Sequence, residues 1–155
     1  MSAKLAAQAD NVTMSGGGLY SLATKGAKDV IDNATPQVLS AVDNLPLNTD
    51  STQFTMADMG CADGGTSLAM VGTVLAAVKA KSPQAQLSVV YADQPRNDFN
   101  ALVSIVHGLT SFETYLDNTP DVYPLFSGTS FYRQALPSGT LDLGFSATAM
   151  HWLQS

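Results

Sequence analysis

The residues with the clearest chemical potential lie between a strand pattern and a helix pattern. Phe54–Met59 is short and mostly apolar, as a buried parallel strand should be, and residues 68–78 are apolar on nearly every face. Glycines in the bend permit positive φ and leave room for a ligand, while a helix that begins near Thr66 or Ser67 offers free N–H groups. The segment therefore indicates a nucleotide-cofactor loop. Its glycines are Gly60, Gly64 and Gly65.

The spacing of these glycines argues against a phosphate-binding loop. A phosphate loop carries Gly-Lys-Ser/Thr and a dinucleotide site carries Gly-x-Gly-x-x-Gly, whereas Ala62 stands where the second dinucleotide glycine would be. Asp58 is the next-to-last residue of the strand pattern, and its carboxylate would repel a phosphate and attract a cation. The loop thus suits a cationic cofactor, although Asp58 could instead cap a turn or a helix.

A second acid ends the next strand pattern, Leu87–Asp93. Acids at the end of the second strand of nucleotide-binding α/β sheets accept ribose hydroxyls. S-adenosylmethionine has a ribose and no phosphate, and it carries an ammonium and a sulfonium, so that Asp58 and Asp93 would both attract it. The pair of acids predicts this cofactor; the alternative for Asp93 is a surface acid before the turn at residues 94–97.

Four motifs occur in the order and at about the spacing of a known family. On these motifs the chain resembles the SABATH methyltransferases from about Met14 to Ser155. Those enzymes methylate salicylic, benzoic, jasmonic and similar acids, and a caffeine-pathway branch acts on nitrogen. The motifs are Asp58-Met-Gly-Cys-Ala-Asp-Gly-Gly-Thr, Asp93-Gln-Pro-Arg-Asn-Asp-Phe-Asn, Ser127-Gly-Thr-Ser-Phe-Tyr and Ala149-Met-His-Trp-Leu.

The resemblance implies S-adenosyl-L-methionine as methyl donor and S-adenosyl-L-homocysteine as product. The acceptor carboxylate would attack the methyl group without a general base, while two donors, His151 and Trp152, orient it. Without the resemblance, this His-Trp pair could equally pack in a core, and Tyr20 could pack rather than face the sulfonium. The residues implied for the cofactor are Tyr20, Thr24, Asp58, Gly60, Thr66, Asp93, Gln94, Ser130 and Phe131; those implied for the acceptor are Lys28, Thr148, His151 and Trp152.

Several departures from the family pattern leave the acceptor open. The family's Gln that grips the acceptor carboxylate is Ala27 here, with Lys28 next to it. Lys28 is either an alternative anchor or a solvated lysine on a helix face. Thr66 replaces an Asn of the cofactor loop and Thr148 replaces a Tyr. Methylation of a small carboxylic acid is the leading interpretation; N- or S-methylation and a non-catalytic adenosine-cofactor-binding fragment are the alternatives.

Composition limits the classes of partner and the compartment. A net charge of −6 and seven Lys plus Arg disfavour a nucleic-acid partner, because a phosphate backbone requires a basic face. The apolar run at 68–78 is too short to span a bilayer, so we expect no membrane partner and a cytoplasmic location. The single cysteine, Cys61, excludes an internal disulfide, and no residues have metal-ligand spacing. We expect Cys61 to be a small turn residue. A homodimer is compatible with this sequence.

The elements alternate in a pattern typical of an α/β fold. We expect a Rossmann-like class I methyltransferase fold, with a doubly wound, mostly parallel sheet that is incomplete in its C-terminal half. The expected elements are a helix at Leu22–Leu45 interrupted at Thr35–Pro36, a strand that ends at Met59, a helix to about Lys81, a strand at 87–92, a helix from an Asn97 cap to near Gly108, a strand at Tyr123–Phe126, a brief helix after Ser130 and a strand at Leu141–Ser146.

The domain prediction follows from length. Residues 1–155 suffice for one domain, and the helical segment 14–50 is expected to cover the active site. Because the family's members are about twice as long, we expect the chain to be a truncated domain whose acceptor pocket lacks a wall.

Overall fold

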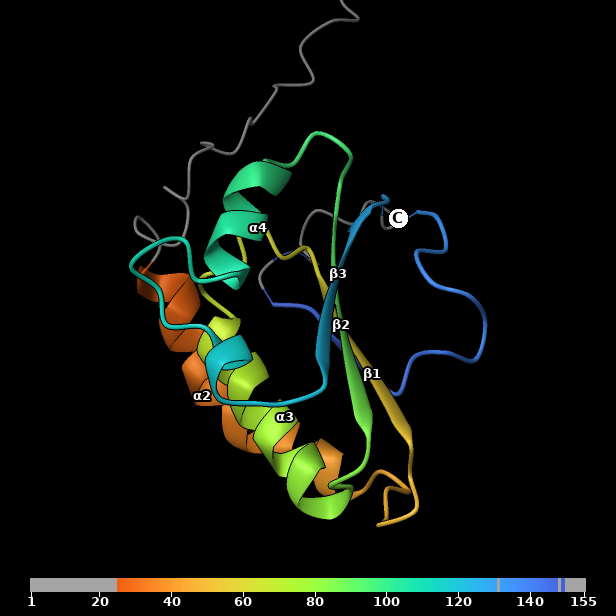
Figure 1. The fold of residues 1–155 in the computed structure, drawn as a ribbon. Helices are drawn as coiled ribbons and strands as arrows, with labels where there is room; N and C mark the ends of the chain where they lie inside the picture. The colour runs from red at the N-terminus through yellow and green to blue at the C-terminus, as the bar shows by residue number, and fades with distance from the viewer. Residues whose placement is uncertain (1–24, 131, 148, 150–155) are drawn as a thin grey trace, which may run out of the picture.

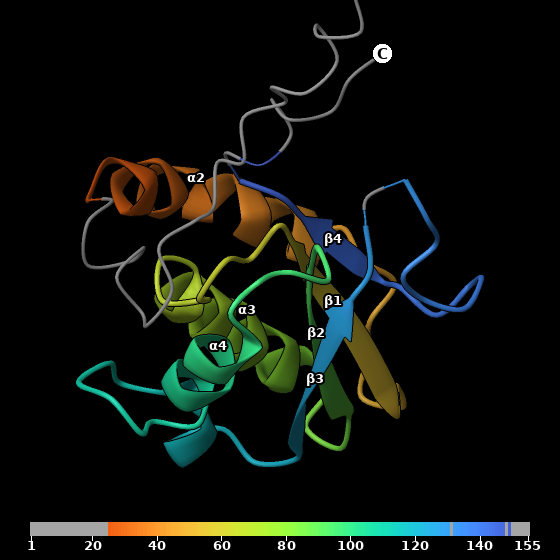
Figure 2. The same cartoon turned by 90° about the horizontal axis from the view of Figure 1, so that it is seen from above.

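Four parallel strands form the sheet of this protein. The computed structural model describes residues 25–130, 132–147 and 149. The strand order is β3-β2-β1-β4, and Figure 2 shows β4 on one side of β1 with β2 and β3 on the other. The chain thus adds β2 and β3 on one side of β1 and then returns to add β4 on the other side, so the strand order reverses at β1. The strands are β1 (Gln53–Met59), β2 (Gln86–Asp93), β3 (Val122–Gly128) and β4 (Leu143–Phe145).

The register of the strands brings their carboxyl ends to one edge of the sheet. Asp58 of β1 lies opposite Tyr91 of β2 and opposite Phe145 of β4. Asp93 of β2 lies opposite Gly128 of β3. Ligands of open α/β sheets bind outside such carboxyl ends, at the point where the strand order reverses. Here that point is the edge between β1 and β4.

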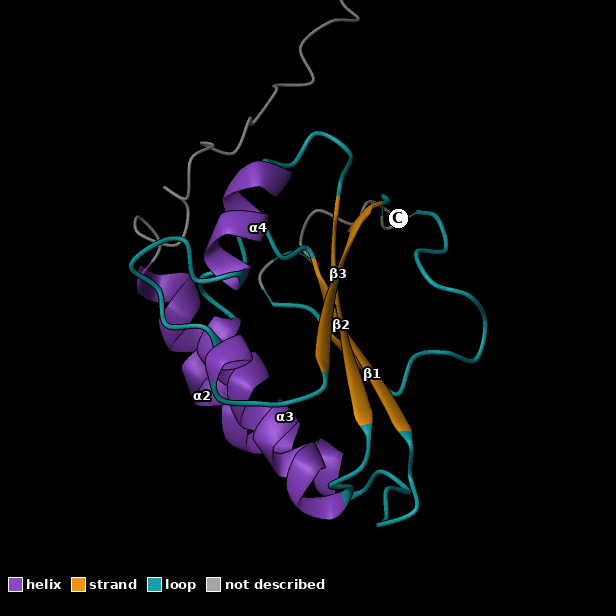
Figure 3. Ribbon diagram, in the orientation of Figure 1, coloured by secondary structure: helices purple, strands orange, loops and turns teal. Residues whose placement is uncertain are grey.

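The helices lie on one side of the sheet, and the loop at 132–142 runs along the other (Figures 1 and 3). α3 supplies most of the helical core because it is apolar on nearly every face, whereas α2 buries only Ile31 and Val42. No helix among the described residues is long and apolar enough to cross a membrane. The helices are α2 (Lys25–Asp43), α3 (Leu68–Lys81), α4 (Phe99–Val106) and the short 3-10 helix η1 (Tyr115–Asp117).

The core fills the space between the sheet and these helices. Phe54, Met56 and Leu87 are fully buried and belong to one apolar cluster with residues of α3. On β3, by contrast, Tyr123 and Leu125 keep 48% and 50% of their surface exposed, and no described helix covers them. The helical layer therefore fixes the positions of the strands, and with them the carboxyl edge.

The α/β prediction with a parallel sheet is confirmed, and all four expected strands are present within two residues of their expected bounds. The expected interruption at Thr35–Pro36 is wrong, because α2 continues through Pro36. Proline removes one helical N–H, but the hydroxyl of Thr35 bonds the Ile31 carbonyl instead of capping a new segment. Packing of α2 against α3 keeps the helix continuous.

Two further local predictions are wrong. The cap of α4 is Asp98 rather than Asn97, because the Asp98 side chain accepts the N–H of Ala101. The described residues 132–142 form turns and bends instead of a helix after Ser130. This segment contains Pro137 and Gly139, and Gly139 has a positive φ of 76°, which a helix cannot accommodate.

Candidate cofactor site

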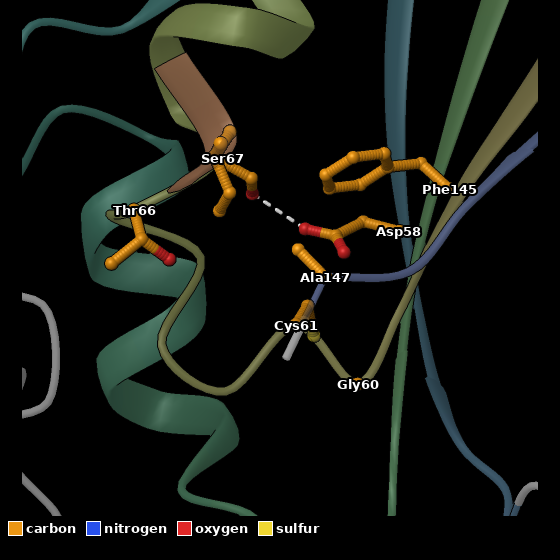
Figure 4. Close-up of a pocket in the computed structure, with 8 residues that line it drawn as sticks. Asp58, Gly60, Cys61, Thr66, Ser67, Phe145 and Ala147 are labelled. Carbon is orange, nitrogen blue, oxygen red and sulfur yellow. Dashed lines mark hydrogen bonds between the residues drawn. The ribbon is translucent and has the colours of Figure 1, made fainter. Parts of the chain in front are cut away.

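A pocket lies where the strand order reverses, between the carboxyl ends of β1 and β4 (Figure 4). The space in it that the centre of a water-sized sphere can occupy is only about 10 Å³, whereas small-molecule sites measure about 300–1,000 Å³. The described residues therefore form the floor of a site and part of its walls. The lining residues are Ile31, Asp58, Gly60, Cys61, Thr66, Ser67, Phe145 and Ala147.

Asp58 is the buried acid of this pocket, with 3% of its surface exposed. The hydroxyl of Ser67 donates to its Oδ2 at 2.5 Å, and the ring of Phe145 lies beside the carboxyl group (Figure 4). Burial raises the pKa of Asp58 from 3.8 to about 6, the Ser67 hydrogen bond lowers it, and the negative charge of Asp93 raises it. A cation placed beside Asp58 would relieve this cost of burying a carboxylate.

The glycine loop begins directly after β1 and is fixed to β2. Gly60 donates its N–H to the carbonyl of Ala92 at 2.7 Å. Gly64 has a φ of 75°, and a Cβ added there would lie 2.7 Å from Leu102 Cδ1. Glycine is thus required at position 64 by both its backbone conformation and its packing against α4.

Asp93 is half-buried at the end of β2 and is held by backbone N–H groups. Its Oδ2 accepts the N–H of Ala62 at 2.8 Å, and its Oδ1 accepts the N–H of Gln94 at 2.7 Å. Each carboxylate oxygen can accept a further hydrogen bond. Asp93 therefore joins the glycine loop to β2 and retains acceptor capacity for a ligand.

Cys61 lies in the same pocket but is poorly suited to attack a ligand. Burial and the charges of Asp58 and Asp93 raise the pKa of its thiol well above the usual range. Since the thiolate is the reactive form, a thiol in this position is inert at neutral pH.

The structure brings part of the predicted cofactor set together. Asp58, Gly60 and Thr66 line the pocket. Asp93 is bonded to the same loop, and Gln94 follows it in an exposed turn. Ser130 lies just after β3, half-buried, where its carbonyl accepts the N–H of Arg133. The predicted residues Tyr20, Thr24, Phe131, Thr148, His151 and Trp152 lie outside the described residues.

Lys28, the predicted acceptor anchor, lies on the exposed side of α2. Its ammonium is 2.5 Å from Oδ2 of Asp32, one helical turn away, and both side chains are about half exposed. This placement favours the alternative of a solvated lysine on a helix face.

Sequence reasoning did not assign Ser67, Phe145 or Ala147 to the site. Ser67 carried a signal, since a serine before a helix and nine residues after a strand-end acid can reach back to it. Phe145 and Ala147 had only their position near the end of the last expected strand. Ile31 reaches the pocket from α2, and nothing in its local sequence indicates this contact.

The charge of the pocket selects its ligands. Among the described residues that line it, none carries a positive charge, and Asp58 contributes a buried carboxyl group. Asp93 adds a second acid at the next strand end. Such a site repels phosphate and favours a ligand with positive charge.

Comparison with known proteins adds an independent result. Residues 10–155 match the profile of the family described as SAM dependent carboxyl methyltransferase. Methyltransferase LUC1 of Fusarium sp is 32% identical over 152 residues, covering 95% of this chain and 40% of that protein. Gibberellic acid methyltransferase 2 of Arabidopsis thaliana is 29% identical over 130 residues, covering 76% of this chain and 31% of that protein.

A solved structure of loganic acid methyltransferase with SAH has the same fold. It superposes with a TM-score of 0.73 at 23% identity, covering 92% of this chain and 41% of that chain. This match confirms the Rossmann-like class I methyltransferase fold. The chain spans about 40% of the length of the first curated relatives that it matches.

Proposed function

The chain belongs to the SAM-dependent carboxyl methyltransferase family, as its motifs predicted, and from this premise we propose what it does. The protein binds S-adenosylmethionine at the carboxyl edge of β1 and β2 and transfers its methyl group to the carboxylate of a small molecule. The observation that carries this proposal is the pair of acids, Asp58 and Asp93, at neighbouring strand ends joined by the glycine loop.

Asp93 is proposed to hold the ribose of the cofactor. Its two oxygens each accept one backbone N–H, from Ala62 and Gln94, which fixes the plane of the carboxylate. The acceptor capacity that remains suits the two vicinal hydroxyls of a ribose. Hydrogen bonds from hydroxyls to an ionised acid are stronger than neutral ones, so this contact contributes substantially to affinity.

Asp58 is proposed to attract the positive charge of the cofactor. It is buried beside Phe145 and is held by Ser67, so its carboxylate is fixed and little screened by water. With a pKa of about 6, Asp58 is mostly ionised at pH 7. A bound cation lowers this pKa further, so we expect cofactor affinity to fall as the pH decreases through about 6.

The acceptor carboxylate is proposed as the nucleophile. One of its oxygens forms a bond to the methyl carbon while the bond from that carbon to sulfur breaks, which gives a methyl ester and S-adenosylhomocysteine. A carboxylate is already ionised at pH 7, so orientation and exclusion of water account for the catalysis. His151 and Trp152 remain the predicted orienting donors, and Thr148 remains a predicted acceptor-binding residue.

Two relatives carry acceptor names that agree with this chemistry, gibberellic acid and loganic acid, which are both carboxylic acids. They support the class of acceptor and not its identity, since Ala27 stands where the family has a carboxylate-binding Gln. The proposed arrangement of residues 1–155 is one cofactor-binding domain, with segment 14–50 next to the acceptor.

Calorimetry with S-adenosylmethionine, S-adenosylhomocysteine and NAD tests the proposed function. We expect both adenosyl ligands to bind and NAD, with its two phosphates, to bind at least about tenfold more weakly. Transfer of labelled methyl to a panel of small carboxylic acids, amines and thiols then tests the acceptor. Binding of NAD in preference to the adenosyl ligands, or transfer to amines or thiols only, would contradict the proposal.

A further inference from the structure

Asn97 has a side chain whose role is not explained by the start of α4. The helix is capped by Asp98, whose Oδ1 accepts the N–H of Ala101 at 3.1 Å. The Asn97 side chain instead points back to the glycine loop, where its Nδ2 donates to the carbonyl of Ala62 at 2.7 Å. It therefore joins the turn after β2 to the loop after β1.

Ala62 is the residue that this contact holds. It is buried and has a φ of 52°, a conformation that residues with a Cβ adopt reluctantly. Its N–H is bonded to Asp93 and its carbonyl to Asn97, so both polar groups of the residue have a side-chain partner from the end of β2. These two bonds together fix the direction in which the Ala62 N–H points.

The Asn97 amide is itself presented by a short hydrogen-bonded turn. The backbone N–H of Asn97 donates to the carbonyl of Gln94 at 2.9 Å, and its carbonyl accepts the N–H of Phe99 at 2.9 Å. The side chain thus projects half-buried from a fixed backbone that follows Asp93 directly. Asn97 can transmit the position of this turn to Ala62 through its own hydrogen bond to the Ala62 carbonyl.

We infer that Asn97 is a positioning residue, which holds the Asp93 carboxylate in place for the ribose of the cofactor through the backbone of Ala62. This inference rests on the proposed function. If Ala62 were released from Asn97, its strained φ would relax and its N–H would turn away from Asp93. The carboxylate would then be held only by the N–H of Gln94 on its Oδ1, and binding the ribose would require its Oδ2 to be ordered again.

The test is calorimetry of Asn97→Ala with S-adenosylhomocysteine and with its 2′,3′-dideoxy analogue, which lacks the ribose hydroxyls. We expect Asn97→Ala to lower the affinity for S-adenosylhomocysteine about tenfold and to change the affinity for the dideoxy analogue by less than about twofold. Asn100→Ala, on the exposed side of α4, is the matched control and should leave both affinities unchanged. Equal weakening of the two ligands would overturn the inference, because it would show a general effect on the fold.

A double-mutant cycle with Asp93→Ala distinguishes an effect of Asn97 that acts through Asp93 from a direct contact between Asn97 and the cofactor. If Asn97 acts through Asp93, then Asn97→Ala should lower the affinity for S-adenosylhomocysteine by less than about twofold when Asp93 is already alanine. Additive losses would contradict the inference. Should Asn97→Ala fail to fold, Asn97→Ser keeps a turn-forming residue while being too short to reach the Ala62 carbonyl, and the same outcomes apply.

The outcomes also distinguish this inference from the proposed function. A wild-type chain that binds neither adenosyl ligand contradicts the proposed function itself. A wild-type chain that binds, with affinity lost in Asp93→Ala and unchanged in Asn97→Ala, contradicts only the role of Asn97.

Discussion

Asp58 and Asp93 end neighbouring strands, and their surroundings differ in almost every respect. Asp58 is buried, accepts a side-chain hydroxyl from Ser67 and has a pKa raised to about 6. Asp93 is half-buried and accepts backbone N–H groups on both of its oxygens. The first environment penalises charge, whereas the second fixes a charged group in one orientation.

This difference indicates that the two acids have separate tasks. A charge whose burial is costly gains most from a cationic partner, so Asp58 suits the positive end of a cofactor. A carboxylate held by N–H groups is suited to accept further hydrogen bonds in a defined geometry, so Asp93 suits the ribose. The comparison can be tested by substituting each acid, a glycine of the loop between them, and a charged residue outside the pair.

The largest effect is expected from Asp93→Ala. If Asp93 holds both ribose hydroxyls, the variant should lose on the order of 2–4 kcal/mol of affinity for S-adenosylhomocysteine. Calorimetry measures this, with Asp50→Ala in the exposed turn before β1 as a control that should bind like the wild type. Unchanged affinity in a folded Asp93→Ala variant would show that Asp93 does not hold the ribose.

The second effect concerns Asp58 and the stability of the protein without cofactor. Its pKa is raised from 3.8 to about 6 in the folded chain, so the folded state binds this proton more tightly than the unfolded state. Its contribution to stability is therefore present at low pH and is lost as the pH rises through about 4 to 6, a loss of about 3 kcal/mol.

Urea denaturation of the wild type and of Asp58→Asn across this pH range measures the difference, because the other groups titrate in both proteins. Asp58→Asn keeps an acceptor for the Ser67 hydroxyl and should become more stable than the wild type above pH 6, while binding S-adenosylmethionine more weakly. A stability difference that is independent of pH would contradict the buried-acid interpretation.

The third effect concerns the loop that joins the two acids. Gly64→Ala should lower the free energy of unfolding by about 2 kcal/mol, because the added Cβ would clash with Leu102 and the φ of 75° disfavours alanine. Gly139→Ala isolates the conformational part, about 1 kcal/mol, since its φ is 76° and nothing lies within 4 Å. Gly26→Ala in α2 should stabilise the protein. Equal losses at positions 64 and 139 would mean that the contact with Leu102 is unimportant.

The smallest effect is expected from Lys28→Met, outside the acid pair. Because Lys28 forms a half-exposed ion pair with Asp32, its removal should cost less than about 0.5 kcal/mol of stability and leave cofactor affinity within about twofold. With an acceptor in hand, kcat/KM should change by less than about twofold as well. A tenfold or larger fall in kcat/KM would instead establish Lys28 as an acceptor anchor.

The parts of the site that sequence predicted are those encoded locally. Asp58 and Asp93 each end an apolar strand pattern, and parallel strands place such ends at one edge. The same reasoning gave the correct four strands, because the apolar runs of buried parallel strands are conspicuous.

What sequence could not predict depends on neighbours far along the chain. Phe145 reaches the pocket because β4 pairs with β1, a contact between residues 87 positions apart. Asn97 and Asp98 are equally good caps by residue type. The Asn97 side chain donates to the carbonyl of Ala62, and Asp98 therefore caps the helix. Pro36 ends a helix by local rules, but packing against α3 overrode them.

The most direct test of the account is a crystal structure of the protein with S-adenosylhomocysteine. We expect the cofactor to lie across the carboxyl ends of β1 and β2, with both ribose hydroxyls within hydrogen-bond distance of the Asp93 oxygens and its ammonium on the side of Asp58. A cofactor bound elsewhere on the sheet, or an Asp93 carboxylate that makes no contact with the ribose, would contradict the division of tasks between the two acids.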